Sequence, residues 1–355
     1  MKVALVYDRV NKWGGAERVL LALHEIWPDA PLYTAVYDEK QAPWAKVFQV
    51  KPSFLQHFPF AKSYHELYPW LTPMAFETFN FGEFDVVISI TSAEAKGIIT
   101  KPKTLHICYC LTPTRYLWSG KDVYENTPGM WGLGLRVWGP TLRKWDLVAS
   151  SRPDHYIAIS KRVKDRIKKY YQRDSDVIYP PVDIFQSTSS KSEYFLVVSR
   201  FVGYKRVDII IDAFNHLGWP LVIIGDGLQR KELQERADKN IRFIDRHLTE
   251  EELHAYYGNC RALISAADED FGIAAVEAMG AGKPVISFSE SGISEVVESG
   301  KTGIFFEEQN KRAIISALQT FIKKRFDPEF CRKQAQRFAK ERFKKEFKNK
   351  ILSLV

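Results

Sequence analysis

Residues 267–286 read Ala267-Asp-Glu-Asp-Phe-Gly-Ile-Ala-Ala-Val-Glu-Ala-Met-Gly-Ala-Gly-Lys-Pro-Val-Ile286, with two carboxylates, Glu269 and Glu277, eight residues apart. An apolar run, Leu263-Ile-Ser265, comes just before and predicts a buried strand. Gly272 suits a tight turn between this strand and a helix of small residues, because glycine has no Cβ. The stretch therefore predicts a strand, a turn and a helix, the repeating unit of an α/β fold.

A helix that begins near Gly272 would direct the N–H groups of its first turn into the crevice at the carboxyl end of the strand. Anionic nucleotides and sugars bind in this crevice of α/β domains. We therefore expect Phe271, Gly272 and Ile273 to bind a nucleotide, with Glu269 and Glu277 facing the same crevice. Carboxylates there accept hydrogen bonds from the hydroxyl groups of a ribose or hexose. Two solvated glutamates are the plain alternative, but the Phe-Gly turn and the small-residue helix favour a binding site.

Four further motifs carry a resemblance to a known family. They are Gly14-Gly-Ala-Glu-Arg-Val-Leu20, Ile159-Ser-Lys-Arg-Val163, Tyr179-Pro-Pro-Val-Asp183 and Ser199-Arg-Phe-Val-Gly-Tyr-Lys-Arg-Val-Asp208. With the paired glutamates, they make almost the whole chain resemble the family-4 retaining glycosyltransferases of the GT-B fold. The likeness is greatest to the bacterial mannosyltransferase branch that builds surface polysaccharides. It implies an α/β fold of two Rossmann-like, doubly wound domains that face a central cleft, with a C-terminal helix crossing back to the first domain.

The resemblance also implies roles for matching residues. Arg200 and Lys205 follow the first strand of the second domain, and two cations there would stabilise a nucleoside diphosphate as it leaves. Glu277 would hold the ribose of the nucleotide, and Glu269 the hydroxyls of the transferred sugar. Such an arrangement of protein cations needs no metal ion. We therefore expect catalysis by Arg200, Lys205 and Glu269, with no metal ion and no cofactor beside the nucleotide sugar, which is the donor substrate.

The first domain offers a second, weaker set of candidates. Gly14 and Gly15 lie between the first strand and the first helix, where the backbone can approach a ligand and the helix N-terminus carries partial positive charge. Glu17 and Arg18 follow, and either reach the cleft or form a surface salt bridge. No G-x-G-x-x-G motif is present, which speaks against a nicotinamide cofactor.

One position departs from the family pattern. Many relatives carry a histidine after the strand at 105–110, where it faces the 6-hydroxyl of the donor sugar, but this chain has Leu111. Leucine can neither donate nor accept a hydrogen bond, so the identity of the donor sugar is open at this point. Arg115 could meet a phosphate of donor or acceptor. His106 opens the same strand, and we expect it to be structural.

The length of 355 residues and the hydrophobic fraction of 45% suit two domains with separate cores. Apolar strand runs alternate with helical patterns twice, which predicts two parallel sheets covered on both faces. The predicted strands lie at 2–7, 32–36, 85–90, 105–110, 155–160 and 177–179, and then at 194–199, 220–225, 241–244, 261–266, 284–288 and 303–306. Two prolines and a polar linker separate the two sets. We assign residues 1–185 to an acceptor-side domain, 186–326 to a nucleotide-sugar domain, and 327–355 to helices that return to the first domain.

The net charge of +8 is unevenly distributed, since residues 323–355 hold twelve Lys and Arg against four Asp and Glu. No nucleic-acid motif accompanies this charge, so we expect no nucleic-acid partner. A solvated helical face and contact with an anionic membrane surface both explain the basic tail. The aromatic segment 54–70 also has two interpretations. It suits either a membrane interface or sugar-binding platform, or a helical hairpin packed inside the first domain.

No apolar segment approaches the ~20 residues that a membrane-spanning helix needs, and the first strand has no cleavage site of a signal peptide. We expect a cytoplasmic protein that is a candidate for peripheral attachment to the inner face of the cell membrane. Its four cysteines, Cys108, Cys110, Cys260 and Cys331, fit reduced and mostly buried thiols.

The leading hypothesis is a retaining hexosyltransferase that moves mannose from GDP-mannose onto a glycan or a polyprenyl-diphosphate-linked glycan in surface polysaccharide synthesis. A 6-deoxyhexose transferase is one alternative, because Leu111 would accommodate a methyl group. A catalytically inactive binding or scaffold protein is the other. Glu269, Glu277, Arg200 and Lys205 speak against it, whereas Leu111 leaves it open.

Overall fold

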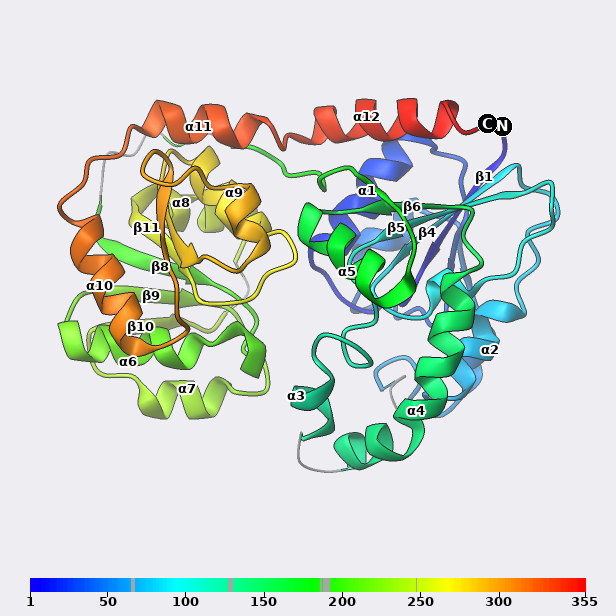
Figure 1. Ribbon diagram of the computed structural model, residues 1–355, viewed down its shortest axis with the longest axis horizontal. Coiled ribbons are helices and arrows are strands. Elements are labelled where there is room, and N and C mark those ends of the chain that lie inside the picture. The colour runs from blue at the N-terminus through cyan, green and yellow to red at the C-terminus, as the bar shows by residue number, and fades with distance from the viewer. Residues whose placement is uncertain (65–67, 127–129, 186, 188–191, 247) are drawn as a thin grey trace. The chain divides into compact units, whose positions relative to one another are not determined.

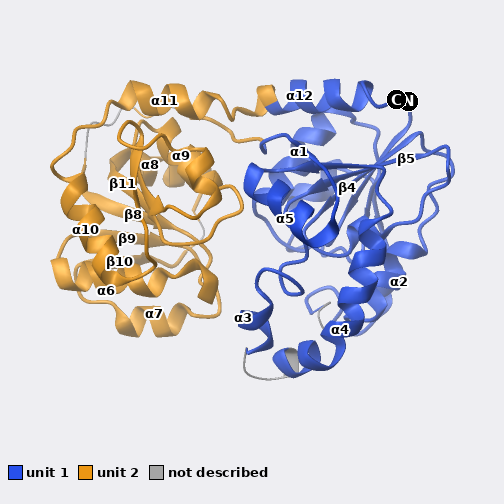
Figure 2. Ribbon diagram, viewed as in Figure 1, with its two compact units in different colours: residues 1–180, 343–355 blue, residues 181–342 orange. Residues whose placement is uncertain are grey.

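The structure, a computed structural model, describes residues 1–64, 68–126, 130–185, 187, 192–246 and 248–355. It divides into two compact units, shown in different colours in Figure 2. Unit 1 comprises residues 1–180 and 343–355, and unit 2 comprises residues 181–342.

Unit 1 is built on a seven-stranded sheet in the order β3-β2-β1-β4-β5-β6-β7, and every pairing in it is parallel. Its strands are β1 (Val3–Tyr7), β2 (Leu32–Thr34), β3 (Val50–Pro52), β4 (Val86–Thr91), β5 (Leu105–Cys110), β6 (His155–Ala158) and β7 (Asp176–Val177). The chain builds outward from β1 to β3 and then returns to add β4 on the other side of β1. This order is the doubly wound arrangement that the alternating pattern predicts.

The helices of unit 1 cover both faces of this sheet. They are α1 (Gly15–Ile26), α2 (Leu71–Glu77), α3 (Lys121–Glu125), α4 (Met130–Ser150) and α5 (Lys161–Tyr171), with the short 3₁₀ helices η1 (Pro43–Val47), η2 (Phe54–His57) and η4 (Ala95–Gly97). In α1 the predicted apolar stripe is buried, with Val19, Leu20 and Leu23 almost fully covered. On the other face, Leu55 of η2 and Phe76 of α2 belong to one apolar cluster with Val6 and Val87 of the sheet.

Unit 2 has a six-stranded parallel sheet in the order β10-β9-β8-β11-β12-β13. Its strands are β8 (Tyr194–Val198), β9 (Leu221–Ile224), β10 (Ile241–Ile244), β11 (Cys260–Ser265), β12 (Val285–Phe288) and β13 (Gly303–Phe306). Its helices are η5 (Gly203–Lys205), α6 (Val207–Leu217), α7 (Arg230–Arg236), α8 (Glu250–Asn259), α9 (Ile273–Gly280), η6 (Gly292–Glu295), α10 (Lys311–Phe321) and α11 (Pro328–Gln336). The strand order repeats that of unit 1, so both halves are Rossmann-like and the predicted fold class is confirmed.

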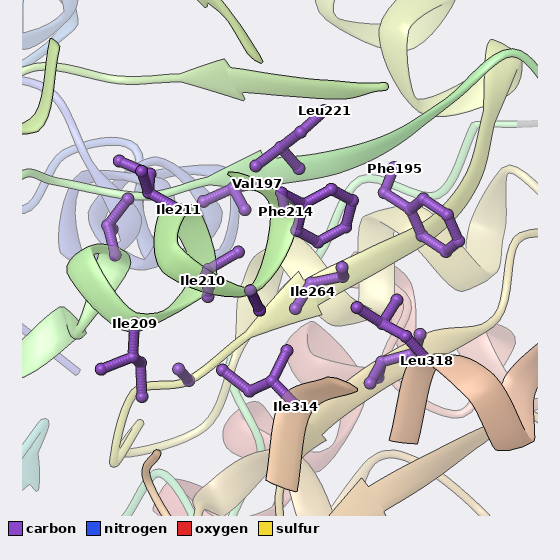
Figure 3. Packing of buried hydrophobic residues seen from close by; sticks show 14 of the residues in the cluster. Phe195, Val197, Ile209, Ile210, Ile211, Phe214, Leu221, Ile264, Ile314 and Leu318 are labelled. Atoms are coloured by element: carbon purple, nitrogen blue, oxygen red, sulfur yellow. The ribbon is translucent and has the colours of Figure 1, made fainter. Parts of the chain in front are cut away.

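The core of unit 2 lies between the sheet and helices α6 and α10 (Figure 3). Phe195 and Val197 of β8 and Ile264 of β11 meet Phe214 of α6 and Leu318 of α10, and all five are at most 2% exposed. Helices α8 and α9 cover the opposite face (Figure 1). Because both faces are covered, the strands read as nearly continuous apolar runs instead of alternating ones.

The boundaries of the units differ from the predicted ones in two places. The first unit ends at Pro180, five residues before the predicted boundary, and the polar linker at 186 and 188–191 lies outside the described residues. Residues 327–342, which we assigned to the returning helices, count with unit 2. The reason is packing, since Phe338 contacts Phe271 with ring centroids 5.5 Å apart and Gln334 Nε2 donates to the carbonyl oxygen of Val296.

The last residues of the chain do belong to unit 1. Helix α12 (Lys340–Leu352) buries Phe343, Phe347 and Ile351, and the first two contact the ring of Tyr109 in β5 at 5.8 and 5.5 Å. The basic tail therefore uses its apolar side chains to pack against its own unit. Among the described residues, no helix has the length and apolar character that crossing a membrane requires.

Candidate active site

The strand order of unit 2 creates a switch point at its centre. Strand β8 has β9 on one side and β11 on the other, and the connections that leave β8 and β11 run in opposite directions along the sheet. Crevices outside the carboxyl ends of such strands are the usual ligand sites of open α/β sheets. Arg200 and Lys205 follow β8, and Glu269 follows β11, so all three predicted residues come from loops at this edge.

Lys205 and Glu269 form an ion pair. The Nζ atom of Lys205 lies 2.6 Å from Oε1 and 2.5 Å from Oε2 of Glu269. The side chains are 11% and 22% exposed, respectively, so the pair is partly shielded from solvent yet open on one side. A charge pair with this shielding interacts more strongly than one at the free surface. The structure thus brings together two residues that lie 64 positions apart in the chain.

The backbone around Glu269 is held from both sides. Its N–H donates to Oγ of Ser291 at 3.2 Å, and its carbonyl oxygen accepts from the N–H of Gly292 at 2.8 Å. A Cβ on Gly292 would overlap the carbonyl group of Asp270, so only glycine permits this close approach. The carboxylate of Glu269 is therefore carried on a fixed segment.

Arg200 lies on the same loop as Lys205 and is exposed. Its Nη2 donates to the hydroxyl of Tyr204 at 2.8 Å, and the ring of Tyr204 in turn lies 5.3 Å from Nζ of Lys205. Tyr204 thus touches both cations. A guanidinium at the rim of the loop keeps its fork of donors available for a bidentate anion.

The turn before α9 has the predicted geometry. Gly272 is the N-cap of α9 with φ of +100°, a conformation that side chains rarely adopt, and a Cβ there would also overlap Cγ1 of Ile293. Helix α9 begins at Ile273, so the first N–H groups of the helix lie at the carboxyl edge of β11. The side chain of Phe271 packs into the core against Phe338. Phe271 can therefore contribute to a ligand site only through its backbone.

Glu277 is more deeply placed than Glu269. It is buried in the second turn of α9, and its Oε2 accepts a hydrogen bond of 2.6 Å from the hydroxyl of Tyr257 in α8. Tyr257 is fully buried, and Phe185 lies beside it with ring centroids 5.9 Å apart. Sequence reasoning missed Tyr257, because no spacing links a tyrosine of one helix to a glutamate twenty residues further on. The contact fixes one oxygen of Glu277 within the protein.

In unit 1, Gly14 is the N-cap of α1 and Gly15 is its first residue. Of the two alternatives for Glu17, the surface salt bridge is wrong. Its carboxylate is buried and accepts a hydrogen bond of 2.7 Å from the hydroxyl of Tyr7, so it is no surface ion pair. Burial raises the pKa of Glu17 above its ordinary value. Glu17 therefore anchors the first turn of α1 to β1.

A second buried network of unit 1 has no sequence signature. Nζ of Lys96 lies 2.6 Å from Oδ1 of Asp146, and both side chains are almost completely buried. The same carboxylate accepts hydrogen bonds from Thr114 Oγ1 at 2.7 Å and from Trp118 Nε1 at 2.7 Å. Because an unpaired charge would be costly at this depth, these contacts fix the inner face of α4 to the carboxyl edge of the sheet.

Two further predictions concern β5. Leu111 follows this strand directly, and its N–H donates to the carbonyl oxygen of Thr91 at 2.8 Å. His106 lies fully buried within the strand, 2.9 Å from Oγ of Ser89 through Nε2. Burial lowers the pKa of His106 to about 3, so this ring is neutral and structural. All four cysteines are free and buried, as predicted.

Within the described residues, no group of three or more His, Cys, Asp and Glu side chains could hold a metal ion. Unit 2 offers two cations, Arg200 and Lys205, and the N-terminus of α9. Together they can bind a negatively charged group, while Glu269 and Glu277 can accept hydrogen bonds from hydroxyls.

Residues 182–342 match the family described as glycosyl transferases group 1, and this range coincides with unit 2. An uncharacterized glycosyltransferase of Methanocaldococcus jannaschii is 31% identical over 169 residues, which are 46% of this chain and 48% of that protein. The O-antigen chain mannosyltransferase C of Escherichia coli is 26% identical over 193 residues, covering 49% of this chain and 50% of that protein. The chain thus spans about half the length of these curated relatives.

Among solved structures, HepE of Anabaena in complex with UDP superposes with a TM-score of 0.74 at 18% identity, covering 99% of this chain and all of that one. At this identity the likeness establishes the fold over both units. The family match covers unit 2 alone, so unit 2 is the part of the chain that resembles the group 1 glycosyl transferases in sequence. The predicted resemblance to glycosyltransferases of the GT-B fold is thereby confirmed.

Proposed function

We propose that this protein is a retaining glycosyltransferase that moves a hexose from a nucleoside diphosphate sugar onto a glycan or lipid-linked glycan, without a metal ion. In the reaction the bond between the sugar C1 and the diphosphate oxygen breaks, and a bond from C1 to an acceptor hydroxyl oxygen forms. The nucleoside diphosphate departs with the electron pair of the broken bond, and the acceptor hydroxyl gives up its proton. Negative charge therefore grows on the diphosphate.

The observation that carries the proposal is the Lys205–Glu269 ion pair at the switch point of unit 2. Lys205 supplies a fixed positive charge for the departing diphosphate, with Arg200 on the same loop and the N-terminus of α9 as further positive groups. Glu269 orients the ammonium group and offers its carboxylate oxygens to the sugar hydroxyls. Because these charges are already in place, they require little rearrangement as the bond breaks.

Glu277 would bind the ribose of the nucleotide. Tyr257 holds one oxygen of its carboxylate in place. Gly272 and Ile273 would contribute backbone N–H groups at the start of α9. Gly14 and Gly15 offer the corresponding helix start of unit 1, at α1.

Mannose from GDP-mannose is the donor we propose. The support comes from the mannosyltransferases among the relatives, in Escherichia coli and Salmonella typhimurium, which act in O-antigen chains by name. By the same comparison the acceptor would be a glycan or a polyprenyl-diphosphate-linked glycan of a surface polysaccharide. The reaction would then take place on the cytoplasmic side of the membrane, where nucleotide sugars are found.

One observation favours a second donor. Leu111 follows β5 at the place where many relatives have histidine, and a leucine leaves a sugar 6-hydroxyl without a side-chain partner. A 6-deoxy sugar would place its methyl group against Leu111 favourably. Water can replace the missing partner in a polar site, so the 6-hydroxylated donor stays the main proposal.

A panel of sugar nucleotides tests the proposal, with release of free nucleoside diphosphate as the readout. GDP-mannose should be turned over faster than GDP-6-deoxyhexoses and UDP-hexoses when a lipid-linked glycan is supplied. A preference for the 6-deoxy donor would select the second candidate. Binding of donor without any turnover would point to an inactive binding protein.

A further inference from the structure

Helix α4 of unit 1 exposes an unusual face. Of its residues from Gly132 to Ser150, the exposed ones are Leu133, Arg136, Val137, Trp138, Pro140, Thr141, Lys144, Leu147 and Val148. Six of these nine are apolar, two are cations, and none is acidic. Leu133, Val137 and Val148 are 59%, 62% and 59% exposed. Single exposed apolar residues are ordinary, but a contiguous set along one helix marks an interaction surface.

The inner face of α4 is fixed, so the helix cannot roll to bury these side chains. Asp146 is tied to Lys96, Thr114 and Trp118, as described above. Trp145 donates from Nε1 to Glu77 at 2.9 Å, and a Cβ on Gly97 would meet its ring. The exposed face is therefore a stable property of the fold.

The exposed face continues onto the neighbouring segment. The ring of Trp138 lies 5.7 Å from that of Trp70, which precedes α2, and both tryptophans are about half exposed. Met74 of α2 is half exposed as well. Trp70 ends the aromatic segment 54–70, whose residues 65–67 lie outside the described part of the chain. We call the exposed residues of α4 together with Trp70 and Met74 the α4 surface; in Figure 1, α4 lies at the lower edge of unit 1.

We infer that the α4 surface docks on an anionic lipid bilayer. Interfacial helices combine apolar side chains, tryptophans at the boundary with water, and Lys or Arg that attract acidic headgroups. The charge selects this occupant, because the exposed side chains of α4 include Arg136 and Lys144 and no carboxylate. An enzyme bound to the membrane would also encounter a lipid-linked acceptor by diffusion within the plane of the bilayer, so the inference extends the proposed function. The evidence for the inference is the α4 surface and does not depend on the transferase activity.

The sequence suggests two candidates for membrane contact, the basic C-terminal stretch and the aromatic segment 54–70, and the second contributes Trp70 to the α4 surface. In the C-terminal stretch, α12 buries Phe343, Phe347 and Ile351 within unit 1. It therefore has no comparable apolar face for a bilayer. The sequence of α4 does not reveal this face, because Gly and Pro interrupt its helical pattern of apolar residues. The exposed side is defined only by the tertiary contacts of Asp146 and Trp145, which face inward.

Flotation of the whole protein with vesicles tests the inference. The wild type should float with vesicles of phosphatidylglycerol and phosphatidylcholine in equal parts, and less with pure phosphatidylcholine. Val137→Glu/Val148→Glu should reduce the bound fraction about tenfold or more, because it removes apolar contact and adds repulsion. Arg136→Gln/Lys144→Gln should remove most of the preference for phosphatidylglycerol.

The matched control adds the same charge elsewhere. Leu228, at 93% exposed, and Ile322 lie on unit 2, and Leu228→Glu/Ile322→Glu should float like the wild type. Absence of flotation of the wild type, or equal flotation of Val137→Glu/Val148→Glu, would overturn the inference. The inference would also be overturned if the wild type bound no vesicles but formed a dimer that Val137→Glu/Val148→Glu dissociates. The α4 surface would then be occupied by a second copy of the chain. The flotation assay contains no sugar nucleotide, so a negative result would not count against the proposed transferase activity. Conversely, a protein without transferase activity could still float with the vesicles.

Discussion

The ammonium group of Lys205 lies 2.5 Å from a carboxylate oxygen of Glu269, although one residue follows β8 and the other follows β11. The pair exists because β8 and β11 are neighbours in the sheet, so their carboxyl ends meet at one edge. Under the proposed function, this ion pair joins a cation for the diphosphate to an acceptor for sugar hydroxyls. In the proposed mechanism the leaving diphosphate and Glu269 share the charge of Lys205.

The first prediction concerns the two cations. Lys205→Ala and Arg200→Ala should each lower turnover by about 10²–10³-fold, because each removes positive charge that acts most strongly in the transition state. Initial rates of nucleoside diphosphate release measure the effect. Lys231→Ala is the control, since Lys231 lies on α7 with its side chain 90% exposed and only a loose contact to Glu235. Turnover near the wild-type rate in both variants would exclude these residues from the mechanism.

A second prediction separates the two glutamates. Glu277→Ala should weaken binding of the free nucleoside diphosphate, whereas Glu269→Ala should leave that binding nearly intact and reduce transfer. Tyr257→Phe should weaken nucleotide binding about tenfold, because the hydroxyl that orients Glu277 is lost from a buried site. Tyr256→Phe is the matched control and should leave nucleotide binding unchanged, because the ring of Tyr256 contacts Tyr194 and Arg242. Calorimetric titration gives the affinities, and unchanged affinity in Glu277→Ala would contradict its assignment.

Two glycines with positive φ, Gly218 at the C-terminal end of α6 and Gly272 before α9, allow a comparison. Gly218→Ala should cost about 1–2 kcal/mol, since its φ is +67° and nothing lies within 4 Å of an added Cβ. Gly272→Ala, with φ of +100°, should cost a further 1–3 kcal/mol or so, because its Cβ overlaps Ile293. Denaturant unfolding measures both. Adding Ile293→Ala to Gly272→Ala should relieve the overlap, so the double variant should lose less free energy of unfolding than the sum of the two single variants. Additive losses would argue against an overlap between the added Cβ and Ile293.

His106 predicts a pH dependence of stability. In the folded protein burial lowers its pKa to about 3, while the unfolded chain keeps the ordinary value of 6.5. Between these pH values the unfolded state therefore binds more protons than the folded state. The free energy of unfolding thus decreases as the pH falls from 6.5 toward 3. This loss is at most about 1.4 kcal/mol per pH unit. The same interval should show a smaller slope for His106→Asn than for the wild type. Equal slopes would mean that His106 is protonated in the folded state.

Much of the fold could be predicted because it depends on local patterns. Local sequence predicts the strands β8 and β11 from their apolar runs, α1 from its apolar stripe, and the turn before α9 from Gly272. The same holds for Lys205 and Glu269, since motifs after neighbouring strands of a doubly wound sheet must meet. The residues that sequence reasoning missed act across the chain. Tyr257 reaches Glu277 from another helix, and Lys96 reaches Asp146 fifty positions away, so tertiary packing alone brings them together.

The burial of Glu17 shows a different limit. A glutamate in the first turn of a helix usually lies at the surface, where the helix N-terminus stabilises it. Here the hydroxyl of Tyr7 provides a partner inside the protein, and nothing in the local sequence distinguishes the two situations.

The central claim is that the edge of unit 2 at β8 and β11 binds a nucleoside diphosphate sugar through Lys205, Arg200 and the start of α9, without a metal ion. The most direct measurement is calorimetric titration of the whole protein with GDP-mannose in the presence of excess chelator. We predict saturable binding that chelator does not change, that Lys205→Ala weakens at least about tenfold, and that Lys231→Ala leaves intact. Absence of binding to any sugar nucleotide, or binding that is lost with chelator and restored by a divalent ion, would contradict the account.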